Sequence, residues 1–158
     1  MKGKKEITRD EALLKLASLC ARSEQCAFDL GRKLSAWGLS AADAAGVIGE
    51  LRERRFVDDR RFAEAFTRDK VKFSAWGRMK IRMGLLAKRI PAALIDEAFA
   101  TVDPDDYAAA AMRAGEAAAR RLDLNTREDA VKLYRHLLSR GFESATAMET
   151  LRSLRCKE

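Results

Sequence analysis

The sequence of 158 residues has little of the chemistry on which most enzymes and metal sites depend. It contains three cysteines and one histidine, His136, which together make neither a disulfide framework nor a common zinc site. No glycine-rich phosphate loop precedes a Lys-Ser/Thr pair. The acid pairs Asp58-Asp59 and Asp105-Asp106 stand at predicted helix starts, where carboxylates complement the helix dipole. We therefore expect no metal, no cofactor and no enzymatic activity.

Long apolar runs are also missing. No run approaches the roughly 18 apolar residues that a membrane helix needs. The first six residues are mostly charged and no apolar segment follows them, so we expect no secretory signal. Alanine supplies 28 residues and proline only two, which predicts a thin core of closely packed helices. These features indicate a cytoplasmic, helical protein.

What the sequence does have is positive charge, and it is unevenly placed. The chain has 31 basic and 24 acidic residues, a net charge of +7. Residues 1–57 carry +3, residues 58–102 carry +4, and residues 103–158 are neutral. From Lys70 to Arg89 there are seven basic residues and no acid, interleaved with Phe73 and Trp76. Such a field attracts polyanions and acidic protein surfaces, although long basic side chains can also simply solvate exposed helix faces.

The apolar spacing is helical almost throughout. Ser23 resembles the N-cap of a second helix, which Gly38 ends, and Ser40 caps a third. Further helices are predicted to start at Asp58 or Asp59, at about Ala75, at Pro91, at Pro104 and at Thr126, with a final helix after Gly141.

Three positions mark an internal repeat. Gly38, Arg89 and Gly141 are separated by 51 and 52 residues, and a leucine stands four residues before each. Apolar residues also recur one, ten and thirteen residues after each marker. We predict an all-α protein of three tandem three-helix repeats with an elongated or curved outline. A basic N-terminal tail (1–10) precedes modules at 11–57, 58–102 and 103–158.

The helix expected to end at Lys88-Arg89 has three distinct edges. At about 100° per residue, Arg78, Arg82 and Arg89 fall within about 40° of each other and form a basic stripe. One apolar edge holds Ile81 and Leu85, and a second holds Met79, Met83 and Leu86. This pattern predicts a helix packed between two neighbours.

Aromatic residues near this helix allow two interpretations. Trp76 can stack on a nucleic-acid base or anchor the core at the helix start. We assign Phe62 and Phe66 to the core.

Several of these motifs together resemble the RecX family, the regulators of the RecA recombinase. The residues that carry the resemblance are Asp58-Asp59-Arg60-Arg61-Phe62-Ala63-Glu64-Ala65-Phe66, then Trp76-Gly77-Arg78-Met79-Lys80-Ile81, with Asp29-Leu30-Gly31-Arg32-Lys33-Leu34 before them and Ser139-Arg140-Gly141-Phe142 after them. The resemblance spans about residues 11–155. Arg89 departs from the family, which usually has glycine there.

The resemblance implies a bacterial regulator that acts in DNA repair and the SOS response. It would bind the RecA filament on single-stranded DNA, lie in its groove and restrain ATP hydrolysis and strand exchange without catalysis of its own. We expect a monomer that contacts DNA weakly and non-specifically and does not bind membranes. The predicted filament and nucleic-acid contact set is Arg68, Lys70, Lys72, Arg78, Lys80, Arg82, Lys88 and Arg89, with Arg22, Arg32 and Lys33 as secondary members.

Two other functions remain open at this stage. Three-helix modules of this size also occur in stand-alone DNA readers, but the third helices here, such as 91–102, are not basic on an outer face. The same positive charge is also compatible with a helical adaptor that binds an unrelated acidic protein.

Overall fold

The computed structural model describes residues 6–157, and every regular element in that range is an α-helix. Residues 1–5, which form half of the predicted basic tail, lie outside the described residues, and the first helix begins at Arg9. The described helices are α1 (Arg9–Arg22), α2 (Ala27–Ala36), α3 (Ala41–Glu53), α4 (Asp59–Ser74), α5 (Arg78–Ala87), α6 (Ala92–Ala100), α7 (Pro104–Ala119), α8 (Arg127–Ser139) and α9 (Ser144–Arg155).

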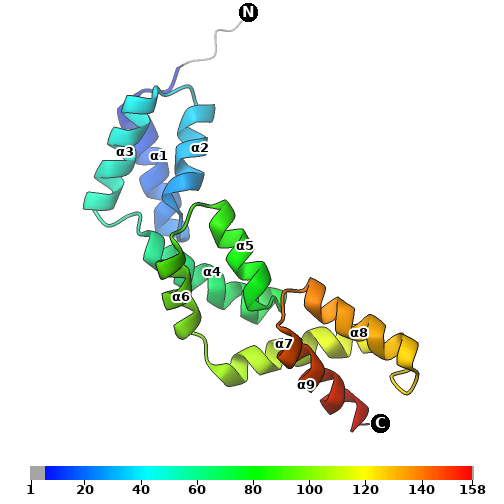
Figure 1. Cartoon of the computed structure of the whole chain (residues 1–158). Helices are drawn as coiled ribbons and strands as arrows, with labels where there is room; N and C mark the ends of the chain where they lie inside the picture. The colour runs from blue at the N-terminus through cyan, green and yellow to red at the C-terminus, as the bar shows by residue number, and fades with distance from the viewer. Residues whose placement is uncertain (1–5, 158) are drawn as a thin grey trace, which may run out of the picture.

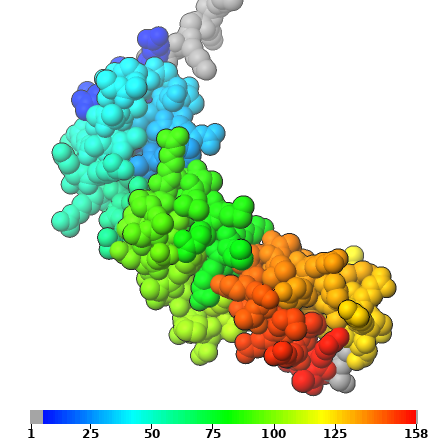
Figure 2. Space-filling model, viewed as in Figure 1, coloured from blue at the N-terminus to red at the C-terminus, as the bar shows by residue number. Residues whose placement is uncertain are grey.

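The helices follow one another in three groups of three, which confirms the predicted all-α repeat. We call α1–α3, α4–α6 and α7–α9 the first, second and third modules. The modules lie in a row from one end of the molecule to the other (Figure 1), and the filled outline is elongated (Figure 2). The helices pack mainly within their modules, and α4 also packs on α7.

The buried side chains form two cores. The smaller core belongs to the first module and includes Leu16, Leu34 and Leu51. The larger core is continuous through the second and third modules and includes seven buried alanines, as the alanine-rich composition predicted for closely packed helices. Phe62 is buried in this core and Phe66 packs against it, which confirms both as core residues. The second and third modules therefore share one hydrophobic unit.

The turn after the second helix of each module has the same hydrogen bonds in all three copies. Gly38, Arg89 and Gly141 all have positive φ, of 87°, 57° and 95°. The following amide then donates back across the turn, as in Leu39 N to Leu34 O and in the equivalent pairs of the other modules. This six-to-one bond is the helix-ending motif that a left-handed residue permits. The repeat markers are thus three copies of one turn.

Arg89 adopts the left-handed conformation although it is not glycine, so it carries strain of about 1–2 kcal/mol. We expect Arg89→Gly to be more stable than Arg89→Ala by about 1 kcal/mol, because both variants lose the arginine side chain and only glycine relieves the strain. Equilibrium unfolding in denaturant measures the difference. Equal stability of the two variants would contradict this account of the turn.

Two predicted helix starts were wrong. Ser23 is the C-cap of α1, and α2 begins only at Ala27, behind Cys26, whose side chain makes no capping bond. The Ala27 amide instead donates to the Asp59 carboxylate at 3.0 Å, so the cap comes from the next module. Ala75 is the left-handed residue that ends α4, and α5 begins at Arg78. The Ser40, Asp58 and Thr126 side chains do cap their helices.

Candidate functional site

The acid-free stretch from Lys70 to Arg89 occupies the end of α4, the connection to α5, and all of α5. Helix α5 packs on α4 and α6, so its charges lie at the centre of the row of modules. The predicted contact residues do not form one free surface. They divide into cations in internal ion pairs, cations over aromatic rings, and cations without an ion pair.

Three predicted contact cations are paired with carboxylates inside the molecule. Arg78 contacts Glu143 at 3.1 Å, Arg82 contacts Asp96 at 2.6 Å, and Lys88 contacts Asp29 at 2.6 Å. The pairs of Arg78 and Lys88 cross from the second module to the third and to the first. The predicted stripe of Arg78, Arg82 and Arg89 therefore serves partly to join and brace the modules.

The start of α5 is bonded to the third module through its backbone. The Gly77 and Met79 amides donate to the carbonyls of Arg140 and Gly141 at 2.9 and 3.0 Å. The Arg78 amide donates to the Tyr107 hydroxyl at 3.0 Å. These partners satisfy amides that an isolated helix start would leave without acceptors. We call this contact the α5 joint.

Side chains complete the α5 joint around Glu143. The Tyr107 hydroxyl donates to Glu143 at 2.6 Å, and the Arg78 guanidinium lies 4.2 Å from the centre of the Tyr107 ring. Burial, followed by the hydrogen bond to Glu143, raises the pKa of Tyr107. Burial opposes ionisation of Glu143, but the hydrogen bonds from Tyr107, from the Glu143 backbone amide and from Arg78, together with the positive charge of Arg78, outweigh it and lower its pKa. Glu143 is therefore a carboxylate at neutral pH and holds both partners.

Four further contact cations lie over aromatic rings. The ammonium groups of Lys70 and Lys80 each lie 4.5 Å from the centre of the Trp76 ring. Lys72 lies 5.3 Å from the centre of the Phe73 ring. Arg89 lies 4.9 Å from the ring of Phe28, which Arg32 also approaches at 6.0 Å. Trp76 is half-buried against the core, so the core-anchor interpretation describes its position.

The remaining predicted cations, Arg68, Arg22 and Lys33, are exposed and make no ion pair within residues 6–157. Arg22 and Lys33 belong to α1 and α2, so the secondary set is spread over the first module.

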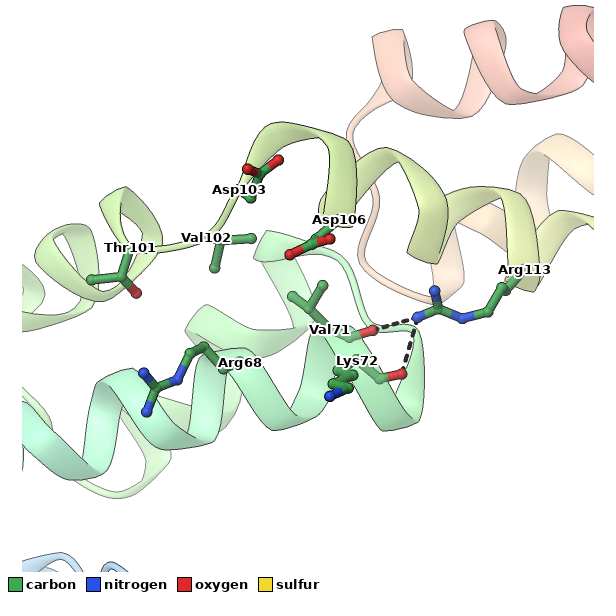
Figure 3. A pocket seen from close by; sticks show the side chains of 8 residues that line it. All are labelled: Arg68, Val71, Lys72, Thr101, Val102, Asp103, Asp106 and Arg113. Carbon is green, nitrogen blue, oxygen red and sulfur yellow. Dashed lines mark hydrogen bonds between the residues drawn. The ribbon is translucent and has the colours of Figure 1, made fainter.

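Arg68 lines a pocket of about 490 Å³ between α4 and the start of α7 (Figure 3). The pocket also holds the carboxylates of Asp103 and Asp106, and Arg113 at its far side donates to the carbonyls of Val71 and Lys72. Its walls are thus of mixed charge, which does not favour a phosphate site.

The sequence pattern placed the second apolar edge of α5 wrongly. Ile81 and Leu85 are fully buried, but Met79, Met83 and Leu86 are exposed. Helix α5 does pack on two neighbours, α4 and α6, but only one of its two apolar edges is covered, and the second edge lies against neither of them. The signal for an exposed edge was available: three apolar residues at helical spacing within an acid-free, basic stretch.

Groups able to support other chemistry are sparse in residues 6–157. No cluster of three or more histidine, cysteine, aspartate or glutamate side chains there has the arrangement of a metal site. His136 is exposed, and the cysteines are free, with Cys26 buried. Within the same range, no helix has the length and apolar character to span a membrane.

The similarity to known proteins extends over nearly the whole chain. The family model described as "RecX, second three-helix domain" matches residues 58–98. A "Regulatory protein RecX" from Chlorobaculum tepidum is 32% identical over 151 residues, covering 95% of this chain and 89% of the relative. Another from Thermus thermophilus is 30% identical over 142 residues, covering 90% and 91%.

Solved structures agree in fold. The crystal structure of RecX from Lactobacillus salivarius superposes with a TM-score of 0.80 at 17% identity, covering 94% of this chain and 97% of that one. A second RecX crystal structure gives 0.79 at 21% identity and covers 92% of this chain and 71% of the other. The helical repeat, the signature residues around α4 and α5, and relatives matched over their length lead to one conclusion: this chain belongs to the RecX family of regulatory proteins.

Proposed function

We propose that this protein binds the RecA filament assembled on single-stranded DNA and restrains its ATP hydrolysis and strand exchange during DNA repair. The observation that carries the proposal is the 32% identity to a RecX regulator over 95% of the chain. The chain is a RecX-type regulator, and the RecA partner is what the family resemblance implies.

The elongated shape supports this role. Three modules in a row provide a surface that extends along a polymer (Figure 2). Weak contacts from each module to successive protomers would add up, because after the first contact the others form at high effective concentration. The α5 joint supports the role further, since it holds two of the modules in a fixed relation.

Charge supports a minor contact to DNA. Arg68 and Lys72 are exposed on α4 and form no ion pair within residues 6–157, so both can approach the phosphates of a DNA strand at the surface, although the mixed charge of the pocket that they also line does not favour a phosphate bound inside it. A sequence-specific reader fits the surface less well. Helix α6, the third helix of the basic module, exposes Asp96 and Glu97, and carboxylates disfavour entry into a DNA groove.

The sharpest test is the RecA ATPase on single-stranded DNA, titrated with this protein. We expect inhibition to saturate at a ratio of inhibitor to RecA well below one, if one molecule spans several protomers. An ATPase rate unchanged at saturating protein would overturn the proposed function.

A matched pair of variants tests the charge assignment in the same assay. Arg68→Glu with Lys72→Glu is expected to raise the half-inhibitory concentration about tenfold, because it reverses exposed charge on the basic module. Arg135→Glu with Arg152→Glu reverses exposed charge on α8 and α9 and should change it by less than about twofold. Equal effects would show that only net charge matters.

A further inference from the structure

Helix α5 carries an apolar edge that no part of residues 6–157 covers. Met79, Met83 and Leu86 are 60%, 72% and 50% exposed, and their i, i+4, i+7 spacing places them on one side of the helix. We call these three residues the α5 stripe. Ile81 and Leu85, on the other apolar edge, are fully buried. The fold therefore uses one edge of α5 and leaves the other open.

Single exposed apolar residues need no explanation, but their concentration here does. Eight large apolar side chains are exposed in residues 6–157, and four of them fall between positions 73 and 86. The fourth is Phe73, 75% exposed at the end of α4, the helix that packs against α5. Methionine and aromatic residues are enriched at protein interfaces, where flexible thioethers adapt to a partner's shape.

The charges around the α5 stripe indicate what kind of surface would cover it. Lys80 and Arg82 stand between its members in the sequence, and the stretch from Lys70 to Arg89 contains no acid. Lys80 and Arg82 are already over rings or paired, so they form a positive rim and not a set of free phosphate ligands. Thioether and leucine side chains gain nothing from a phosphate backbone. An apolar protein groove edged with carboxylates matches both features.

We propose that the α5 stripe is the docking surface for a protein partner that offers such a groove. The inference rests on the proposed function, in which the partner is a RecA protomer of the filament. The α5 stripe would supply most of the binding free energy through apolar contact with the partner. The basic rim would orient the partner and raise the rate of association.

A triple substitution, Met79→Gln, Met83→Gln and Leu86→Gln, tests this surface. Glutamine keeps the charge, roughly the length and a good helix propensity, but removes the apolar contact. Leu14→Gln on α1, at a position 71% exposed, and Met148→Gln on α9 are the matched controls. Binding is measured by co-sedimentation with RecA filaments on single-stranded DNA, and inhibition by the ATPase assay.

We expect the triple variant to bind filaments at least tenfold more weakly, with unchanged helicity and binding to single-stranded DNA alone. The controls should bind within twofold of the unsubstituted protein. Binding of the triple variant equal to that of the controls would overturn the inference and leave the proposed function intact. Failure of the unsubstituted protein to bind filaments would overturn the proposed function and this inference with it.

Three other occupants give distinct results, and each would overturn the inference. Loss of DNA binding by the triple variant would assign the stripe to DNA. Sedimentation showing a dimer that the triple variant converts to monomer would assign it to a second copy of this chain. Binding to anionic lipid vesicles that the triple variant abolishes would assign it to a membrane surface.

Discussion

Gly77→Ala is expected to lower the free energy of unfolding by about 3 kcal/mol, because the added methyl group has no space. A Cβ atom at position 77 would lie 2.2 Å from the backbone of Gly141 and Phe142. The same segment supplies the acceptors of the joint, since the Arg140 and Gly141 carbonyls accept from the Gly77 and Met79 amides, so neither side can move without breaking the α5 joint. Equilibrium unfolding in denaturant measures the loss.

Two other glycines separate the possible causes. Gly38 has a φ of +87° and open space around it, so Gly38→Ala tests backbone strain alone, at about 1–2 kcal/mol. Gly49 lies within α3 with open space and no positive φ, so Gly49→Ala should stabilise the protein by about 0.5–1 kcal/mol. If Gly77→Ala is as stable as Gly38→Ala or more stable, the close approach of position 77 to the backbone of Gly141 and Phe142 does not limit stability.

Arg78→Glu is expected to lower the unfolding free energy by about 2 kcal/mol and, under the proposed function, to weaken the inhibition of RecA, because it opens the α5 joint. The new carboxylate would face Glu143, and the Arg78 guanidinium would no longer cover the Tyr107 ring. Reversal of Arg82 acts differently. Its partner Asp96 belongs to the same module and is largely exposed, so Arg82→Glu should change stability by less than about 1 kcal/mol.

A charge swap decides between a structural and a contact role for Arg78. The double variant Arg78→Glu with Glu143→Arg restores the ion pair with its charges exchanged. We expect it to recover part of both the stability and the inhibition of ATPase. Recovered stability with inhibition still lost would show that Arg78 contacts the filament directly, as the sequence alone predicts for it.

Local sequence was enough to predict the repeat. The left-handed turns at Gly38 and Gly141, the leucines four residues before them and the caps at Ser40 and Thr126 all involve partners within about one helical turn. Because these partners are neighbours in the sequence, the sequence pattern alone identifies them. The turn at Arg89 was found by the same spacing although its residue type does not favour it, because the apolar positions around it demand the same packing.

The ion-pair partners of the basic residues could not be predicted from local sequence in this way. Arg78 and Glu143 are 65 residues apart, and Lys88 and Asp29 are 59 apart, so nothing in their neighbourhood identifies them as partners. The Ala27 amide likewise takes its cap from Asp59 in the next module. A charged helix edge has the same pattern whether its charges face solvent, a partner or another part of the chain.

By itself, then, the sequence determined the all-helical repeat, the family and the location of the positive charge. Only the tertiary structure decided which cations join the modules and which apolar edge of α5 remains uncovered. Helical periodicity places a residue on one side of its helix, but the neighbour against that side comes from distant segments. The Met79, Met83 and Leu86 edge remains exposed because the shared core of the second and third modules is closed by Ile81 and Leu85 alone on this helix.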